Sequence, residues 1–249
     1  MAVIWAKTVN DTHFEVRRAG RSVRLYTNGV FHSQYNPANP VTATVWNLLL
    51  LPAFFRPAGA IRRVLVLGVG GGAVIRLLDR FVAPGHIIGV DLNATHLYVA
   101  RRFFGITQTV ADLVEADAVD WLHRYSGPRF DLIIDDLFGE QGGEPVRTVA
   151  ADRDWLGILS RNLAEDGVLV MNFVGTRMLR ETCRTLHHAG PGHSASAFRL
   201  SLPGYENAVG AFIRQPAEAR HLRERLRATG LPDGMRLSRL PFRIQRIPL

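Results

Sequence analysis

The segment of residues 62–91, RRVLVLGVGGGAVIRLLDRFVAPGHIIGVD, constrains the fold more than any other part of the chain. Its apolar run Val64–Leu67 is continuous, which is typical of a strand buried on both faces of a parallel sheet. The glycine-rich stretch GVGGG follows and lets the backbone turn and approach a ligand without a Cβ between them. A helix and a second strand ending at Asp91 come next, and a carboxylate there can accept hydrogen bonds from ribose hydroxyls. The segment therefore predicts a nucleoside-binding crevice.

From Arg62 onward, strand and helix patterns alternate along the chain. Strands are expected at Val64–Leu67, Ile87–Asp91, Asp112–Glu115, Phe130–Asp135 and Gly167–Phe173. Helices are expected at Ala73–Phe81, Asn93–Phe104, Val119–Tyr125, Ala150–Leu163 and Arg177–Ala189. Two further strands, Phe198–Leu202 and Ala208–Arg214, are close enough to form a hairpin. The pattern predicts an α/β fold with a doubly wound, mostly parallel seven-stranded sheet and an antiparallel terminal hairpin.

The first 35 residues have a different period, in which short alternating runs are separated by turn residues. Asn28-Gly29 between two such runs is a strong hairpin signal. We therefore expect a small N-terminal antiparallel β domain in residues 1–40 and a connecting helix in residues 41–61. The nucleoside-binding domain is expected in residues 62–215, followed by a C-terminal helix and an arginine-rich tail in residues 216–249.

Composition argues against several classes of protein. No stretch approaches the ~18 uninterrupted apolar residues of a membrane-spanning helix, so we expect no membrane segment. Cys183 is the single cysteine, and the N-terminus lacks a signal-peptide pattern, so a cytoplasmic location is expected. The net charge is +8, and residues 216–249 hold eight arginines. This tail could bind a polyanion or a neighbouring subunit, or it could be a solvated helix with an extended end. Because the arginines are not accompanied by aromatic interleaving of the kind used for base stacking, a nucleic-acid ligand is disfavoured.

Acidic residues follow three successive strands, at the edge of the sheet where ligands of such folds bind. Asp91 ends the second strand, and Asp117 follows the third. Asp91 could bind ribose or cap the next helix, although Asn93 is better placed to cap it. Asp117 could accept a hydrogen bond from an adenine amino group or cap its own helix.

Asp135 and Asp136 end the fourth strand and point to opposite faces if the strand continues, so at most one enters the crevice. Two adjacent carboxyls at an apolar strand end favour a raised pKa. The alternative is a turn-initiating aspartate beside a solvated neighbour. The glycine-rich segment of residues 139–145 could be a lid over a site or a flexible connection. The histidines, including His187, His188 and His193, lack the spacing of metal ligands, so no metal site is expected.

Taken in order, the segments VLVLGVGGGAVIRLL, GVDLN, VEADAVDWL, FDLIIDDLFGE and LAEDGVLVMNFVG resemble the spermidine synthase family. The earlier stretch VRLYTNGVFHSQYNP is similar to the β domain that precedes the nucleotide fold in that family. The resemblance covers roughly residues 14–215. It implies the Rossmann-like fold of class I S-adenosylmethionine-dependent methyltransferases, an aminopropyltransferase activity and a homodimer.

The resemblance also implies roles for individual residues. Decarboxylated S-adenosylmethionine, or S-adenosylmethionine itself, would be the co-substrate and an amine the acceptor, with no metal. Asp136 matches the family's general base, which takes a proton from the acceptor amine. His32 or Gln34 lies where the family's hairpin glutamine meets the co-substrate. The implied co-substrate contacts are Gly68, Gly70, Gly72, Asp91, Leu92, Asp117, Ala118 and Gln34.

Three positions depart from the family's pattern. The family's glycine turn carries an aspartate where this chain has Gly71. A second aspartate after the base is replaced by Gly139, with Glu140 one step further on. No acid occurs in residues 40–50, where the family grips a diamine. The departures imply weaker binding of a diamine unless Asp135, Glu140 or Glu144 compensates.

Three alternatives fit the same residues. A methyltransferase on this fold would use S-adenosylmethionine at the same crevice. An NAD-linked dehydrogenase would share the glycine pattern and Asp91, but it requires neither Asp117 nor an early β-hairpin domain. A non-catalytic adenosyl-binding protein would keep its biological activity when Asp136 is replaced by asparagine.

Overall fold

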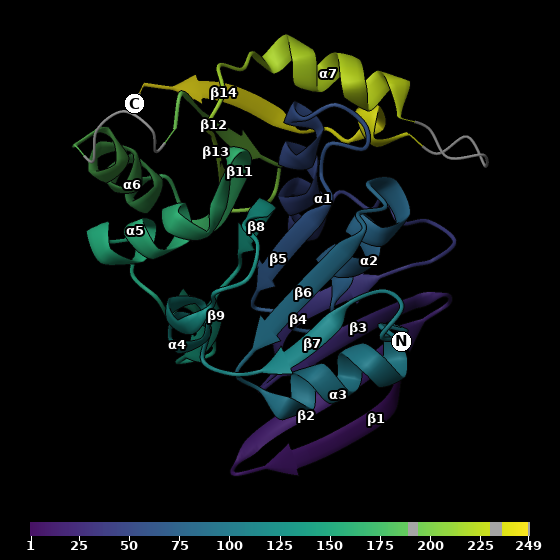
Figure 1. Ribbon diagram of the computed structural model, residues 1–249. Coiled ribbons are helices and arrows are strands. Elements are labelled where there is room, and N and C mark those ends of the chain that lie inside the picture. The colour runs from purple at the N-terminus through teal and green to yellow at the C-terminus, as the bar shows by residue number, and fades with distance from the viewer. Residues whose placement is uncertain (189–193, 230–235, 249) are drawn as a thin grey trace.

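A small N-terminal sheet lies beside a larger mixed sheet flanked by helices in the computed structural model of the chain (Figure 1). The structure describes residues 1–188, 194–229 and 236–248. Ala189, the expected last residue of one helix, and His193 lie outside the described residues.

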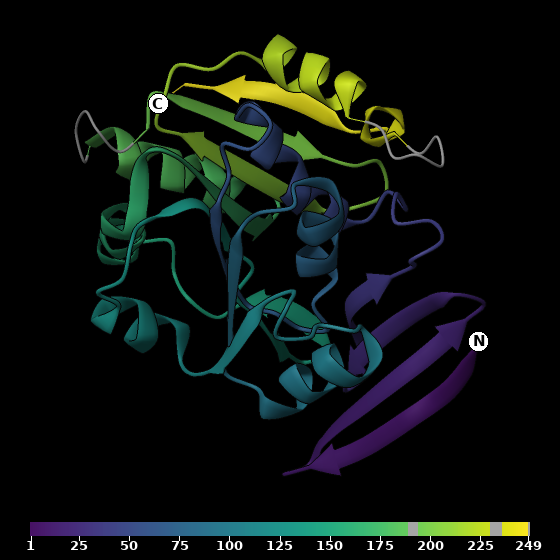
Figure 2. The same cartoon turned by 45° about the vertical axis from the view of Figure 1, so that its right-hand side comes forward.

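The N-terminal sheet consists of β1 (Ala2–Val9), β2 (Thr12–Ala19), β3 (Ser22–Thr27) and β4 (Val30–Tyr35), paired antiparallel in chain order. Asn28 and Gly29 join β3 to β4 with φ values of +49° and +80°, the left-handed conformation that tight hairpins require. Leu25 pairs with Ser33 and Tyr26 with Phe31, so His32 is the additional residue of a β-bulge. The sheet projects from the body of the molecule (Figure 2).

The connecting segment is a short α-helix, α1 (Val45–Leu50), followed by a 3₁₀ turn, η1 (Leu51–Phe55). Asn47 is fully buried, and its side-chain oxygen accepts from the amide of Thr44. The α1 helix and the η1 turn together take the place of the single helix expected over this segment. Every residue of η1 is buried, which explains the apolar run in the sequence.

Within the described residues the larger sheet has eight strands, in the order β14-β12-β13-β11-β8-β5-β6-β7. The parallel strands are β5 (Arg63–Leu67), β6 (His86–Asp91), β7 (Asp112–Glu115), β8 (Phe130–Asp135) and β11 (Leu163–Val174). The antiparallel strands are β12 (Ser196–Ser201), β13 (Asn207–Ile213) and β14 (Arg243–Ile247). The seven expected strands are present, and the arginine-rich tail adds the eighth. The end of the tail therefore pairs with β12 instead of only extending into solvent.

Helices cover both faces of this sheet. On one face lie α1, η1, α2 (Ala73–Phe81), α3 (Ala94–Phe103) and α7 (Ala219–Ala228). On the other lie α4 (Ala118–Arg124), α5 (Arg153–Asn162) and α6 (Arg177–His188). A 3₁₀ turn, η2 (Leu237–Arg239), leads into β14. Val64 and Val66 pack in the first layer and Leu65 and Leu67 in the second, so β5 is buried on both faces as its sequence predicts.

The glycine-rich segment after β8 is a hairpin of β9 (Phe138–Gln141) and β10 (Glu144–Arg147). Gly142 and Gly143 form its turn, both with positive φ. The segment is therefore a two-stranded hairpin.

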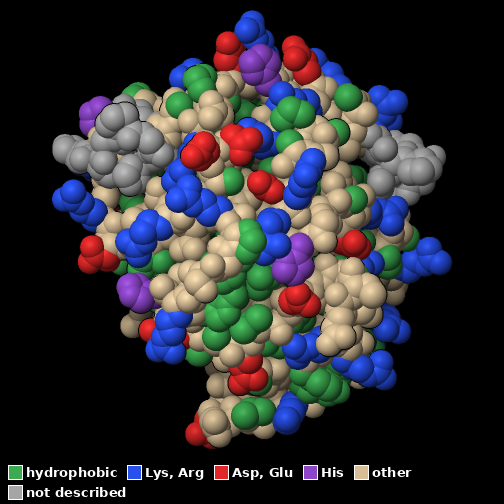
Figure 3. Space-filling view, viewed as in Figure 1, with side chains coloured by type: hydrophobic (Ala, Val, Ile, Leu, Met, Phe, Trp, Pro, Cys, Tyr) green, Lys and Arg blue, Asp and Glu red, His purple; other side chains and the backbone are tan. Residues whose placement is uncertain are grey.

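Lysine and arginine side chains are spread over the visible face of the molecule and do not gather in one patch (Figure 3). In the described part of the chain, no helix is long and apolar enough to cross a membrane.

Candidate active site at the carboxyl edge of the sheet

A cavity of about 810 Å³ opens at the carboxyl ends of β5, β6, β7 and β8. The chain runs from β5 to β6 and β7 on one side and to β8 on the other, so the cavity lies at the topological switch point of the sheet. The N-terminal sheet, α1 and the β9–β10 hairpin contribute the remaining walls. The volume suits a small molecule such as a nucleoside derivative.

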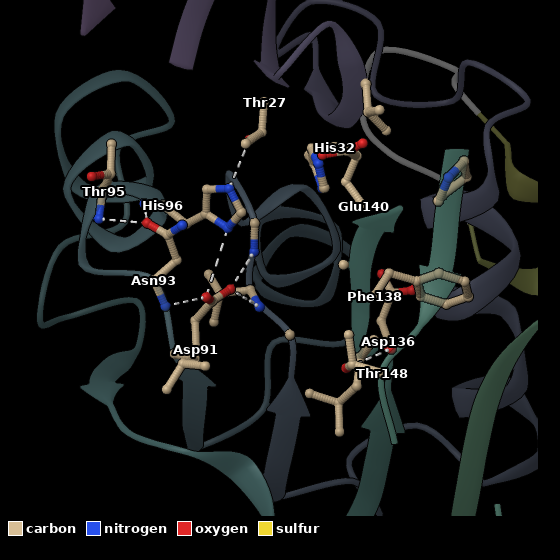
Figure 4. Close-up of a pocket in the computed structure, with 18 of the residues that line it drawn as sticks. Thr27, His32, Asp91, Asn93, Thr95, His96, Asp136, Phe138, Glu140 and Thr148 are labelled. Atoms are coloured by element: carbon tan, nitrogen blue, oxygen red, sulfur yellow. Dashed lines mark hydrogen bonds and ion pairs between the residues drawn. The ribbon is translucent and has the colours of Figure 1, made fainter. Parts of the chain in front are cut away.

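The glycine turn and Asp91 line the cavity. Figure 4 shows Asp91 with its neighbours Asn93 and His96. Gly68 has a φ of +84°, and a Cβ there would collide with the backbone carbonyl of Asp136. Oδ2 of Asp91 accepts from the amides of Val69 at 2.8 Å and Gly70 at 2.9 Å. Its Oδ1 accepts from the amide of Asn93 at 2.8 Å. Asp91 thus fixes the conformation of the turn in addition to facing the cavity, a second role that sequence reasoning missed.

Asn93, and not Asp91, caps α3. Its side-chain oxygen accepts from the amides of Thr95 and His96. Nδ1 of His96 lies 3.7 Å from Asp91 Oδ1, and Nε2 lies 2.9 Å from Thr27 Oγ1 on the N-terminal sheet. Burial opposes ionisation of Asp91, but His96 and the backbone amides outweigh it and lower the pKa of this carboxyl. His96 therefore connects the two sheets beside the Asp91 carboxylate, and no sequence pattern marked it.

Gly71 has no room for the aspartate that the resembling family carries. A Cβ at this position would lie 2.6 Å from Cζ of Phe104 and 2.8 Å from Cβ of Ser33. Gly72, expected to contact the co-substrate, does not line the cavity but precedes α2 with a φ of +84°. The side chains of Phe104 and Ser33 thus fill the space that an aspartate at position 71 would need.

Leu92 and Asp117 line the cavity at the ends of β6 and β7. Leu92 is 70% exposed and offers an apolar surface to the cavity. Asp117 caps α4 through Oδ1, which accepts from the amides of Val119 and Asp120 at 2.9 Å. Capping uses only Oδ1, so capping and ligand binding are compatible. Ala118 is buried in the core and does not line the cavity, because it is already the first residue of α4.

Asp135 and Asp136 take opposite directions, as strand alternation predicts. Asp135 is fully buried and pairs with Arg147 at 2.5 Å, and it also accepts from the indole of Trp155 at 2.8 Å. Asp136 lines the cavity, and its Oδ1 accepts from the side-chain Nδ2 of Asn172 at 2.8 Å. Burial raises the pKa of Asp136 to about 6, and the neighbouring Asp135 adds to the effect. A carboxyl in this state is ionised at neutral pH yet basic enough to take a proton.

His32, and not Gln34, lines the cavity. The β-bulge at His32 adds one residue to β4, which turns Ser33 inward and Gln34 outward. Gln34 instead accepts from Nε of Arg24 at 2.6 Å. Burial lowers the pKa of His32 to about 4, so its imidazole is neutral at pH 7. Its Nε2 has no hydrogen-bond partner among the described residues and is available to a ligand.

Glu140 is the carboxylate that β9 contributes to the cavity. It accepts from the amide of Gly143 at 2.6 Å and from the side chain of Asn28 at 3.2 Å. These hydrogen bonds lower its pKa, so it is ionised at neutral pH. Figure 4 shows Glu140 beside His32. The sequence offered Asp135, Glu140 and Glu144 as substitutes for the family's missing acids. Asp135 forms an ion pair with Arg147 and Glu144 does not line the cavity, so only Glu140 of these three faces it.

No group of three or more His, Cys, Asp or Glu side chains in residues 1–188, 194–229 and 236–248 is placed to hold a metal ion. The fold defines the class of protein: an α/β domain of the methyltransferase-like type with an N-terminal antiparallel sheet.

Comparison with known proteins identifies the family within this class. The sequence pattern of the spermine/spermidine synthase domain matches residues 48–218. The chain therefore belongs to the spermine/spermidine synthase family.

A curated relative, the polyamine aminopropyltransferase of Chromobacterium violaceum, is 28% identical over 114 residues. This match covers 45% of the chain and 42% of the relative, so the chain aligns with less than half of that protein. The structure of a probable spermidine synthase from Corynebacterium glutamicum has a TM-score of 0.76 at 15% identity, covering 99% of this chain and 91% of that one. Human methyltransferase-like protein 13 has a TM-score of 0.58 at 21% identity, covering 75% of this chain and 88% of that one. Both structural likenesses establish the fold.

Proposed function

We propose that this chain transfers an aminopropyl group from decarboxylated S-adenosylmethionine to an amine acceptor, with Asp136 as the general base. The observation that carries the proposal is the position of Asp136, beside the glycine turn and with a pKa raised to about 6. Family membership and the name of the Chromobacterium violaceum relative support the same activity.

The chemistry is an in-line displacement at the carbon next to the sulfonium. The acceptor nitrogen forms a bond to this carbon while the carbon–sulfur bond breaks, and its electron pair stays on sulfur to give methylthioadenosine. Positive charge develops on the nitrogen, whose proton passes to the Asp136 carboxylate. Asp91, Leu92 and Asp117 would hold the adenosyl group, and the glycine turn would let the backbone approach it.

Glu140 is the proposed site for a second ammonium group of the acceptor. It faces the cavity from the hairpin wall and is ionised at neutral pH. A diamine could then place one nitrogen at Asp136 and the other at Glu140. This arrangement would replace the acids that residues 40–50 lack.

Product analysis tests the proposal and separates it from methyl transfer, which the methyltransferase fold of the neighbours also allows. The purified chain is incubated with putrescine and either decarboxylated S-adenosylmethionine or S-adenosylmethionine. Methylthioadenosine from the first mixture is expected. Adenosylhomocysteine from the second would favour a methyltransferase, and neither product with a panel of amines would refute the transferase proposal.

The family resemblance implies a homodimer, and the single cysteine favours a cytoplasmic location, so we propose both. Light scattering of the purified chain tests the assembly, with twice the mass of the single chain as the expected result. A single-chain mass at micromolar concentration would contradict it.

A further inference from the structure

Two asparagine side chains connect the antiparallel part of the sheet to Asp136. Asn207, the first residue of β13, donates from Nδ2 to Oδ1 of Asn172 across 3.1 Å. Asn172, on β11, donates from Nδ2 to Oδ1 of Asp136 across 2.8 Å. All three residues line the cavity, and Asn172 is only 4% exposed. The proposed base therefore ends a chain of side-chain hydrogen bonds.

The strand register fixes this chain in place. The β13, β11 and β8 strands are neighbours in the sheet. Asn172 pairs with Val209, and Asn207 lies two residues before Val209, so the two asparagines are diagonal neighbours on one face. Backbone pairing of three adjacent strands thus sets the distance between the amides.

The direction of the hydrogen bonds follows from the chemistry of the amide group. An asparagine side chain presents an acceptor oxygen on one side and a donor nitrogen on the other. Because Asn207 donates to the oxygen of Asn172, the nitrogen of Asn172 is left to face Asp136. The opposite orientation would place an oxygen against the ionised carboxylate, which is unfavourable.

We propose that Asn172 and Asn207 are positioning residues for the transfer reaction: Asn172 holds the Asp136 carboxylate in one orientation, and Asn207 fixes the direction of the Asn172 amide. The inference rests on the proposed role of Asp136 as the base. It adds two residues that act through Asp136 and explains why both are placed in the cavity wall.

The pKa of Asp136 depends on the charged groups around it and on the hydrogen bond from Asn172, the last link of the relay Asn207–Asn172–Asp136. Asp135 on the same strand and Asp91 on β6 raise the pKa of Asp136, whereas Arg147 on β10 lowers it. The hydrogen bond from Asn172 opposes the dominant effect of burial and also lowers this pKa. Loss of the bond therefore raises the pKa of Asp136 above about 6 and reduces its ionised fraction at neutral pH.

The test uses three variants and one control in the full chain. Asn172→Leu removes the donor to Asp136. Asn207→Asp keeps the shape but can only accept a hydrogen bond, so the Asn172 amide turns and presents its oxygen to Asp136. Asn207→Leu removes the donor without adding charge. Glu206→Gln changes an exposed charge next to Asn207 and serves as the control.

The readout is the titration of the Asp136 carboxyl carbon by ¹³C NMR, assigned with Asp136→Asn, alongside the pH profile of kcat/KM. We expect Asn172→Leu and Asn207→Asp to raise the midpoint by about one pH unit. Asn207→Leu should raise it by less, and Glu206→Gln should leave it unchanged.

An unchanged midpoint in folded Asn172→Leu would overturn the proposal. If Asn172→Leu does not fold, the two Asn207 variants provide the test. A shifted midpoint in Asn207→Asp with no shift in Asn207→Leu would mean that the added charge alone causes the shift, and it would refute the proposal. The NMR titration does not depend on turnover. A chain without transferase activity would therefore refute the proposed function, while the effect of the two asparagines on the Asp136 midpoint could still be measured.

Discussion

At the scale of single residues, Asp135 and Asp136 show how a strand gives two adjacent carboxyls different tasks. Asp135 points into the protein and is neutralised by Arg147, with both side chains almost fully buried. Asp136 points into the cavity, where Asn172 donates to it but no cation neutralises it directly among the described residues. The alternation of side chains along β8 is the cause, because neighbouring residues of a strand face opposite sides. The result is one structural carboxylate and one with a raised pKa.

Glu140→Gln tests the second ammonium site. Removing the charge should raise KM for putrescine by about two- to fivefold and leave kcat nearly unchanged, since Glu140 is exposed and its attraction is screened by solvent. Butylamine, which has a single nitrogen, is the matched acceptor. If KM rises equally for both amines, Glu140 does not contact the second ammonium.

At the scale of elements, the β9–β10 hairpin is held against the sheet by a buried ion pair. Arg147 ends β10 and donates to Asp135 on β8 and to the backbone carbonyl of Asn172 on β11. Because the hairpin carries Phe138 and Glu140 into the cavity, this pair also fixes one wall of the site.

Arg147→Met should destabilise the chain by about 3–5 kcal/mol, because it leaves the buried charge of Asp135 without its ion-pair partner. Denaturant unfolding followed by circular dichroism measures the change. Asp135→Asn combined with Arg147→Met should recover most of the loss, since the amide can still accept from Trp155. Arg124→Met, at an exposed ion pair with Asp120, is the control and should change little. Equal effects of Arg147→Met and Arg124→Met would contradict the anchoring role.

The glycine turn offers a second test at this scale. Gly71→Asp restores the residue of the resembling family but forces its Cβ against Phe104 and Ser33, so it should cost about 1–3 kcal/mol. Gly157→Ala in α5 meets open space and should instead stabilise the chain by about 0.5–1 kcal/mol. Thermal unfolding of both variants checks the contrast. Unchanged stability of Gly71→Asp would show that the turn can accept the acid.

At the scale of the whole molecule, the cavity is shared by two sheets. The main sheet supplies Asp91 and Asp136, and the N-terminal sheet supplies Thr27 and His32. The hydrogen bond between Thr27 and His96 joins the sheets inside the cavity. A bound co-substrate would contact both and should stabilise the molecule as a unit.

This coupling predicts a large shift in melting temperature. Decarboxylated S-adenosylmethionine at 100 times its Kd should stabilise the chain by about 2.7 kcal/mol, which corresponds to a rise of roughly 5–10 °C. NAD at the same concentration should give no shift. A shift with NAD as large as that with the sulfonium compound would favour the dehydrogenase alternative.

Local patterns predicted much of this molecule because they act over a few residues. The continuous run Val64–Leu67, the turn at Asn28-Gly29 and the alternation of Asp135 and Asp136 each depend on immediate neighbours, and each agrees with the structure. Other features depend on distant parts of the chain. The bulge that turns Gln34 outward depends on pairing with β3, and the pairing of β14 depends on β12.

The missed site residues have the same explanation. Asn172 and Asn207 meet Asp136 only because β8, β11 and β13 are adjacent. His96 reaches Thr27 across 69 positions of sequence. A buried asparagine within an apolar strand, as in GVLVMNFV, is the signal that could have marked Asn172, since a polar group buried there needs a partner.

In the proposed reaction, Asp136 takes the proton from the acceptor during aminopropyl transfer. The most direct measurement is kcat/KM for methylthioadenosine release from decarboxylated S-adenosylmethionine and putrescine between pH 5 and 8, for the wild-type chain and Asp136→Asn, with the exposed Asp154→Asn as control. Only the carboxylate accepts a proton, so wild-type and Asp154→Asn activity should rise with pH through about 6. Asp136→Asn should lose this rise and about 10²–10⁴ in rate. An Asp136→Asn chain with wild-type activity and the same pH profile would show that Asp136 is not the base.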